Sequence, residues 1–206
     1  MWNRTRIRNR FPIVCLLLTL WTEVSRSTGY FELQMISVEN VNGELADGEC
    51  CDGSRDPEDL RCTRDQCDTY FKVCLKEYQI EVNHKGTCTF GEGSTHVLGG
   101  NTFSLKGAKN NPNKVDEAGR ISIPFEFAWP RTYTVIVEAW DWDNGTRTSK
   151  EELLIERHAH TGMINPGAPW QLLEHDWARG PPRLPGQGAL RRELLRQQVQ
   201  QTLRPA

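Results

Sequence analysis

Between residues 29 and 157 apolar and polar positions alternate with the period of two that is typical of a β-strand with one buried face. Residues 30–38 place Phe31, Leu33 and Met35 on one face and Glu32 and Gln34 on the other. Similar runs predict further strands over residues 69–78, 87–90, 101–105, 121–127, 133–140 and 152–157, although the last could also begin a helix. Turn residues separate these runs at intervals of about ten residues, so the pattern predicts an all-β fold, an antiparallel β-sandwich.

A cysteine-rich loop interrupts this pattern after the first predicted strand. Six of the seven cysteines lie between residues 50 and 88, at Cys50, Cys51, Cys62, Cys67, Cys74 and Cys88. The loop is too polar to bury a core of its own, so we expect disulfide bonds to fix its path. Neighbouring Cys50 and Cys51 should reach different partners, and the spacing leaves the pairing open. A zinc site is the alternative, but no C-x2-C pair is present.

The N-terminus predicts export. Residues 1–10 are rich in arginine, residues 11–21 are apolar, and small polar residues follow at 25–28. The apolar run is shorter than the roughly 20 residues that a membrane-spanning helix needs. We therefore expect a signal peptide over residues 1–28 and a secreted, extracellular chain, which suits disulfide formation.

The C-terminal part has a different composition. Residues 178–206 are rich in Arg, Gln and Pro and contain no aromatic residue and no cysteine. We expect a domain over residues 29–173 and a tail over residues 174–206 that is disordered and not part of the sandwich, with a helix over residues 189–203 as one option.

Several strings resemble the N-terminal, C2-like domain of Notch ligands of the Jagged (Serrate) type. They are GYFELQ at 29–34, NVNGEL at 40–45, CDTYFKVCLKEY at 67–78, LGGNTF at 98–103, FAWPR at 127–131, VEAWD at 137–141 and GMINP at 162–166. WDWDN at 140–144 and EELLIER at 151–157 resemble the second vertebrate Jagged more than the first. The resemblance covers residues 29–173. It implies a β-sandwich that binds the EGF repeats of a Notch receptor. It also implies that the loops at one tip bind phospholipid head groups.

In such ligands a cysteine-rich module, EGF repeats and a membrane helix follow this domain, and none of these is recognisable here. The genetic code suggests a reason. Residues 188–201 can be encoded so that reading one base later gives VRCDENYYGNKCNK, which resembles the start of the missing module. We therefore hypothesise that the tail is a reading-frame product, arising from an annotation error, an exon-boundary slip or a truncating transcript.

The turn after residue 140 contains the candidate metal-binding and glycosylation residues. Asp141 and Asp143 offer carboxylate oxygens of the kind that calcium prefers, and the resemblance implies a calcium site at one tip of the sandwich. Asp65 and Asp68 could contribute if their loop reaches the same tip. An ordinary hairpin turn explains the same residues without a metal. Asn144 begins an N-x-T glycosylation sequon, and a glycan there would compete with a cation for its amide.

For partner contact the candidates are Phe90, His96, Lys109 and Lys114, on or near predicted loops, although Phe90 also fits a core position. The basic loop over residues 106–120 fits a solvated, mobile loop equally well. A net charge of −2 gives no basic field for nucleic acid. Motifs of enzyme active sites are lacking, so we expect a binding protein rather than an enzyme, with a calcium-dependent phospholipid-binding module as the alternative.

Overall fold

The computed structural model describes residues 26–58, 62, 66–105, 117–143, 153–177 and 191–204, with side chains omitted for residues 26, 174–177 and 191–204. Almost every element is a strand. The elements are β1 Arg26–Asn40, β2 Thr69–Lys76, β3 Gly91–Ser94, β4 Thr102–Ser104, the 3₁₀ turn η1 Glu117–Gly119, β5 Arg120–Phe125, β6 Thr132–Asp141, β7 Leu154–Met163, β8 Gln171–Trp177 and β9 Arg191–Arg204. The all-β prediction is confirmed. In the part of the chain that the structure describes, no helix could cross a lipid bilayer.

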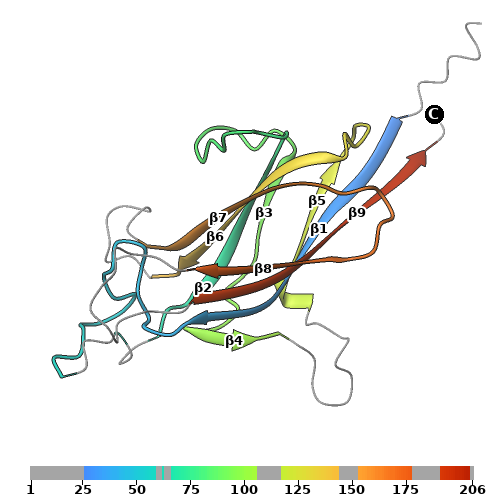
Figure 1. Cartoon of the computed structure of the whole chain (residues 1–206). Coiled ribbons are helices and arrows are strands. Elements are labelled where there is room, and N and C mark those ends of the chain that lie inside the picture. Colours follow the sequence, from blue (N-terminus) through green and yellow to red (C-terminus); the bar gives the residue numbers. More distant parts are fainter. Residues whose placement is uncertain are drawn as a thin grey trace, which may run out of the picture.

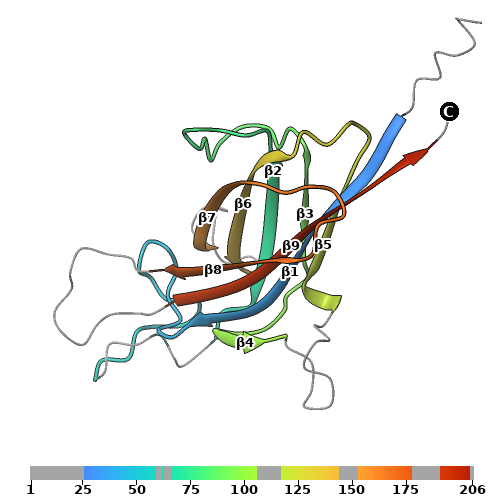
Figure 2. The ribbon, with the colours of Figure 1, turned by 45° about the vertical axis from the view of Figure 1, so that its right-hand side comes forward.

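The strands form two antiparallel sheets that face each other (Figures 1 and 2). One sheet has the order β4-β1-β9-β8, with β5 also pairing with β1, and the other has the order β3-β2-β6-β7. Because β2 and β6 pair antiparallel, Thr69 lies opposite Asp141 at one end and Lys76 lies opposite Thr134 at the other. These two ends of the sandwich are called the Asp141 tip and the Lys76 end below.

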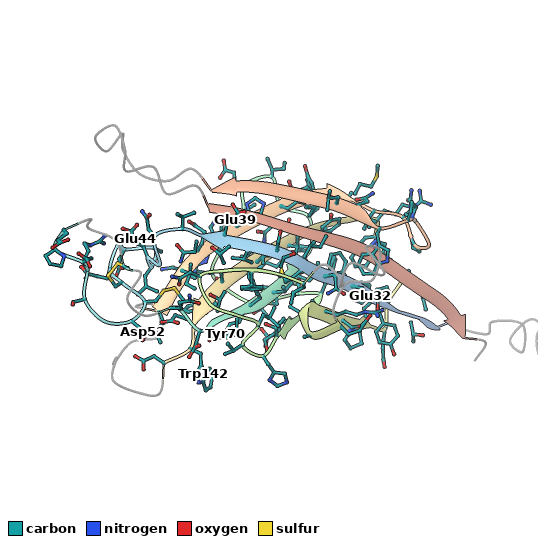
Figure 3. The ribbon with its side chains drawn as sticks, turned by 90° about the horizontal axis from the view of Figure 1, so that it is seen from below. Glu32, Glu39, Glu44, Asp52, Tyr70 and Trp142 are labelled. Carbon is teal, nitrogen blue, oxygen red and sulfur yellow. A yellow bond between two sulfur atoms is a disulfide. The ribbon has the colours of Figure 1, made fainter. Side chains whose placement is uncertain are left out.

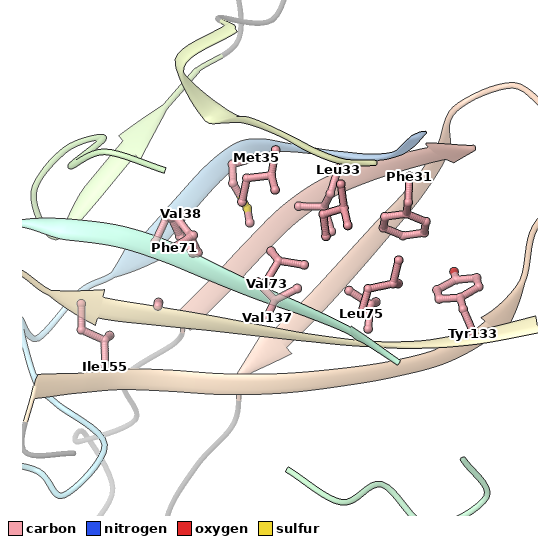
Figure 4. Close-up of a cluster of buried hydrophobic side chains, with 14 of the residues drawn as sticks. Phe31, Leu33, Met35, Val38, Phe71, Val73, Leu75, Tyr133, Val137 and Ile155 are labelled. Carbon is pink, nitrogen blue, oxygen red and sulfur yellow. The ribbon is translucent and has the colours of Figure 1, made fainter. Parts of the chain in front are cut away.

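The core lies between the sheets and follows the predicted alternation. Figure 4 shows side chains from β1, β2, β6 and β7 packed together, with Phe31, Leu75 and Tyr133 toward one end and Val38, Phe71 and Ile155 toward the other. The fully buried members include Phe31, Leu33, Met35, Phe71, Val73, Leu75, Tyr133, Val135 and Val137. Burying each such side chain contributes roughly 1.5–3 kcal/mol, so the two inner faces hold the layers together. Cys74 lies on the opposite side of β2 from Val73 and Leu75.

Strand β3 differs from the prediction. We expected a strand over residues 87–90, ended by the glycines after it, but β3 consists of Gly91–Ser94. The reason is close packing on β5. A Cβ atom on Gly91 would lie 2.6 Å from Ile123 Cγ2, and one on Gly93 would lie 2.6 Å from Ile121 Cγ2. Here the glycines permit two strands to approach and do not break one.

Strand β7 is longer than the predicted strand over residues 152–157. It runs from Leu154 to Met163, and its partners on β6 extend from Trp140 to Thr132. The helical option for this stretch is wrong. The alternation did not predict a strand beyond residue 157, because polar and small side chains dominate there, but pairing with β6 supplies the backbone hydrogen bonds.

The C-terminal segment also departs from expectation, because parts of it join a sheet. Strand β9 lies between β1 and β8, and its pairing runs from Arg191 opposite Asn40 to Arg204 opposite Arg26. The helix expected over residues 189–203 is therefore wrong. Composition failed because backbone groups along β1 can pair with any extended segment, whatever its side chains. At the other terminus β1 begins at Arg26, inside the expected signal peptide, of which residues 1–25 lie outside the described part.

Candidate functional site at the Asp141 tip

The cysteine-rich loop folds onto the Asp141 tip and is held by disulfide bonds. Cys50 pairs with Cys62 and Cys51 with Cys67, with Cα–Cα distances of 5.2 and 5.1 Å. The prediction of disulfides, with the neighbouring cysteines bonded to different partners, is confirmed. All four of these cysteines are buried. The third disulfide, Cys74–Cys88, lies on the outer side of β2.

Two asparagines anchor this loop to the sandwich. The Asn40 side chain donates a hydrogen bond to the carbonyl oxygen of Glu44 at 3.1 Å. The Asn101 side chain accepts one from Cys67 N–H at 2.9 Å, and Asn40 N–H donates to the Asn101 carbonyl at 2.7 Å. The sequence analysis identified neither residue as an anchor, because Asn40 stands in an Asn-Val-Asn-Gly stretch that is typical of a turn and the partner of Asn101 is 34 residues away. Their bonds tie the loop and the segment before β2 to the end of β1.

Asp141 is the most unusual group at this tip. Its residue is 1% exposed, and its Oδ1 accepts a hydrogen bond from Asp68 N–H at 2.7 Å. Within the described residues its Oδ2 has no hydrogen-bond partner, although it is buried. Burial raises the pKa of Asp141 from 3.8 to about 6, the hydrogen bond from Asp68 opposes the rise, and nearby negative charges, Asp52 first, add to it. The site thus holds a buried carboxylate oxygen that a cation or a proton could satisfy.

The other predicted oxygen donors are only partly brought together. Asp68 does reach the same tip, as its hydrogen bond to Asp141 and the bond from Trp142 N–H to its carbonyl at 3.0 Å show. Asp65 and the glycosylation candidate Asn144 lie outside the described residues. Among the residues that are described, no three carboxylate, histidine or cysteine side chains converge as a metal cluster would require. The calcium site at Asp141 and Asp143 stays a prediction.

Aromatic side chains surround this site on the outer face of the second sheet. Tyr70 and Trp142 meet edge to face at 6.0 Å, and Figure 3 shows both at the same end of the molecule as Asp52. The Lys72 ammonium lies 4.3 Å from the ring centre of Trp140. Trp142 itself is 56% exposed. The tip therefore combines buried negative charge with an exposed indole, which period-two reasoning alone could not reveal.

Two of the predicted partner-contact residues are described. Phe90 is partly buried against the core and packs on Phe127 with ring centres 4.9 Å apart, and its role in partner contact stays a prediction. His96 is exposed after β3. Lys109 and Lys114 lie outside the described residues.

Comparison with known proteins decides the family. The family model described as "N terminus of Notch ligand C2-like domain" matches residues 28–180. This chain is a member of that family. The resemblance deduced from the sequence strings is thereby confirmed, and the two-sheet architecture described above is that of a C2-like Notch-ligand domain.

Relatives in this Notch-ligand family include jagged proteins of both vertebrate types. The chain is 54% identical to Protein jagged-1b of Danio rerio over 174 residues, covering 84% of this chain and 14% of the relative. It is 51% identical to human Protein jagged-1 and also to human Protein jagged-2, covering 84% and 82% of this chain and 14% of each relative. These identities do not separate the two types. The chain spans about one seventh of the length of each relative.

A solved structure supports the fold assignment. The structure titled "Structure of Drosophila C2-DSL-EGF1" superposes with a TM-score of 0.63 at 30% identity, covering 84% of this chain and 67% of that chain. The C2-like fold deduced from the resemblance is confirmed by this similarity.

Proposed function

We propose that this chain is an extracellular Notch-receptor-binding module of a Jagged-like ligand. The observation that carries the proposal is the match of the Notch-ligand domain to residues 28–180, together with more than 50% identity to jagged proteins of both types. Its partner would be the EGF repeats of a Notch receptor. Three disulfides support an oxidising, extracellular location.

The proposed mechanism is recognition at a protein surface. A rigid, disulfide-pinned sandwich presents loops at both ends, and such loops commonly carry binding residues. No catalytic step is proposed, since the family match is to a ligand domain. Signalling by the longer relatives would require modules beyond this one, so the isolated chain would act as a soluble competitor and not as an activator.

Binding to immobilised Notch ectodomain, measured by biolayer interferometry with the purified, oxidised chain, tests this function. We expect saturable binding that disappears after the disulfides are reduced and alkylated. In a cell reporter assay the soluble monomer should inhibit activation by full-length ligand. No binding by folded chain, or strong activation by the soluble monomer, would contradict the proposal.

A second candidate function is calcium-dependent binding to phospholipid head groups through the Asp141 tip. The unpartnered, buried Asp141 Oδ2 and the exposed Trp142 beside it support this option, because a cation would satisfy the first and an indole suits a membrane interface. Asp141 would supply one ligand oxygen and Asp143 another. Pelleting with phosphatidylserine vesicles, with calcium and with chelator, should show calcium-dependent binding that Asp141→Asn abolishes. Equal pelleting under both conditions would reject it.

A further inference from the structure

The three disulfide bonds differ in how far solvent reaches them. The four cysteines of the Asp141 tip are at most 4% exposed: Cys50, Cys51, Cys62 and Cys67. The third bond joins Cys74 and Cys88, which are both partly exposed on the outer side of β2. Thiol–disulfide exchange requires a thiolate to reach a sulfur atom, so access favours the Cys74–Cys88 bond as the site of reduction.

This bond closes residues 77–87, called the Lys76 loop here, onto β2. Burial of apolar side chains does not hold the loop in place, because none of its residues is buried and Ile80 and Tyr78 are 90% and 51% exposed. Hydrogen bonds within the loop are exposed to water, for example that from Asn83 N–H to Gln79 Oε1 at 3.0 Å. Exposed bonds compete with water and contribute little, so the covalent bond is the main constraint on the loop.

The loop covers the ammonium group of Lys76. Lys76 is only 2% exposed, and its ammonium donates hydrogen bonds to the carbonyl oxygens of Asn83 and Lys85, both at 2.8 Å. Water can replace both carbonyl oxygens if the loop moves away, and hydration of a charged group is favourable. The contact therefore adds little to the closed state, and opening of the loop would expose Lys76 to solvent.

The strands on either side of the loop are fixed without the disulfide. Strand β2 pairs with β6 along its whole length. After the loop, Phe90 N–H donates to the Leu75 carbonyl oxygen at 2.9 Å, and Gly91 of β3 lies opposite Leu75 of β2. The buried cluster between the sheets includes neither cysteine of this bond. Breaking the bond should therefore release the loop and leave the sandwich folded.

We propose that the Cys74–Cys88 bond is a redox-sensitive switch. The dithiol group of an extracellular oxidoreductase reduces it and releases the Lys76 loop, while both disulfides of the Asp141 tip stay closed. This inference does not rest on the proposed function. Cys88 is the residue attacked, because it follows the exposed residues 83–87, whereas Cys74 lies within β2.

The exchange balances in two steps. A thiolate of the reductant attacks Cys88 Sγ, a mixed disulfide forms as the Cys74–Cys88 bond breaks, and Cys74 leaves as a thiolate. The second thiolate of the reductant then displaces Cys88 from the mixed disulfide. The reductant ends as a disulfide, its two protons pass through water to Cys74 and Cys88, and two electrons have moved to the protein.

Differential alkylation of the folded, oxidised chain tests the selectivity. The chain is incubated with reduced thioredoxin as the dithiol, quenched with acid, alkylated and mapped by mass spectrometry. We expect Cys74 and Cys88 to be alkylated at least about tenfold faster than the four cysteines of the Asp141 tip. A thioredoxin variant without its second cysteine should be trapped on Cys88. Equal rates, faster reduction at the Asp141 tip or no reduction of the folded chain overturns the proposal, and trapping on Cys74 overturns the assigned order of attack.

Release of the loop has a separate readout in the reactivity of two lysines. After reduction, Lys76 should be acetylated by an amine-reactive reagent about tenfold faster than in the oxidised chain. Lys72 is the internal control, because it lies on the same side of β2 but contacts aromatic rings and not the loop, and its rate should not change. Amide hydrogen exchange should become faster in residues 77–87 and stay unchanged in residues 133–139 of β6.

The matched control is the double variant Cys74→Ser, Cys88→Ser. Its loop should exchange at the faster rate both with and without thioredoxin, which shows that the reductant acts through this bond. Reduction of Cys74 and Cys88 in wild type with Lys76 still protected and loop exchange unchanged would refute the switch. Faster exchange throughout β6 would refute it as well, because the bond would then hold the whole sandwich and not the loop.

Discussion

Asp141 makes a quantitative prediction about stability and pH. Its pKa is raised from 3.8 to about 6 by burial first and by neighbouring acids second. Because the folded protein binds this proton more tightly than the unfolded chain does, the group favours folding at low pH and loses that contribution as pH rises from about 4 through 6. A rise of about two pKa units corresponds to roughly 3 kcal/mol, which is an upper limit for this site.

Asp141→Asn should remove this dependence while keeping the shape of the side chain. The amide oxygen can still accept the hydrogen bond from Asp68 N–H, and the amide nitrogen then occupies the place of Oδ2, at a cost of about 1 kcal/mol that does not vary with pH. The assay is reversible urea unfolding in chelator at several pH values between 4 and 7. The free energy of unfolding of the variant minus that of wild type should increase by up to about 3 kcal/mol over this range.

Taking this difference cancels the titration of carboxylates that do not interact with Asp141, so the slope belongs to Asp141 and its acidic neighbours. A flat difference between pH 4 and 7 would show that Asp141 titrates normally. A difference that falls with pH would show that the ionised carboxylate is stabilised in the native state, and the reasoning from burial would be refuted. Repeating the pH 7 measurement with calcium should stabilise wild type and leave Asp141→Asn unaffected, if the cation binds there.

Three further predictions address the core, the Cys74–Cys88 disulfide and the glycosylation sequon at Asn144. Leu75→Ala, at a fully buried position between the sheets, should lower the free energy of unfolding by about 2–5 kcal/mol in urea titration, and a loss below 1 kcal/mol would contradict the packing described. Replacing Cys74 and Cys88 together by serine should cost roughly 3 kcal/mol, judged from a separation of 14 residues between the bonded cysteines, and should leave the other two disulfides intact in non-reducing peptide maps. If Asn144 is glycosylated in secreting cells, Asn144→Gln should remove a glycosidase-sensitive mass shift, and identical masses would reject the sequon.

Period-two alternation predicted most strands because one-sided burial controls them. Phe71, Val73 and Tyr133 all occupy the inner faces that the pattern assigned to them. The glycines of β3 misled the analysis, since a glycine that ends a strand and one that lets two strands approach look alike in sequence. Glu32 shows a similar limit, because it is buried beside Arg120, a partner 88 residues away that the strand pattern cannot identify.

The candidate sites were harder to predict than the fold, because they depend on contacts between distant segments. The turn residues at 140–145 identified Asp141 as a carboxylate at a loop tip, where calcium sites occur. They could not show that Asp68 N–H donates a hydrogen bond to it, or that its Oδ2 is buried without a partner among the described residues. The alternation over residues 69–78 places Lys76, like Lys72, on the polar side of its strand. Only the folded loop distinguishes it from Lys72, since the carbonyl groups that bind its ammonium come from residues 83 and 85.

The pairing of β9 with β1 does not decide whether the tail is encoded in the correct frame. Ladder hydrogen bonds join backbone groups, so an extended segment of almost any sequence can occupy the place between β1 and β8. Residues 197–201, Gln-Gln-Val-Gln-Gln, lack the alternation that marks β1 and β6, whereas the shifted reading contains cysteines and aromatic residues that this tail lacks. The two frames therefore predict different transcripts, and sequencing independent cDNA clones separates them. An uninterrupted frame that encodes the Arg- and Gln-rich tail in several clones would refute the frame-shift hypothesis, and β9 would then be a true strand of this domain.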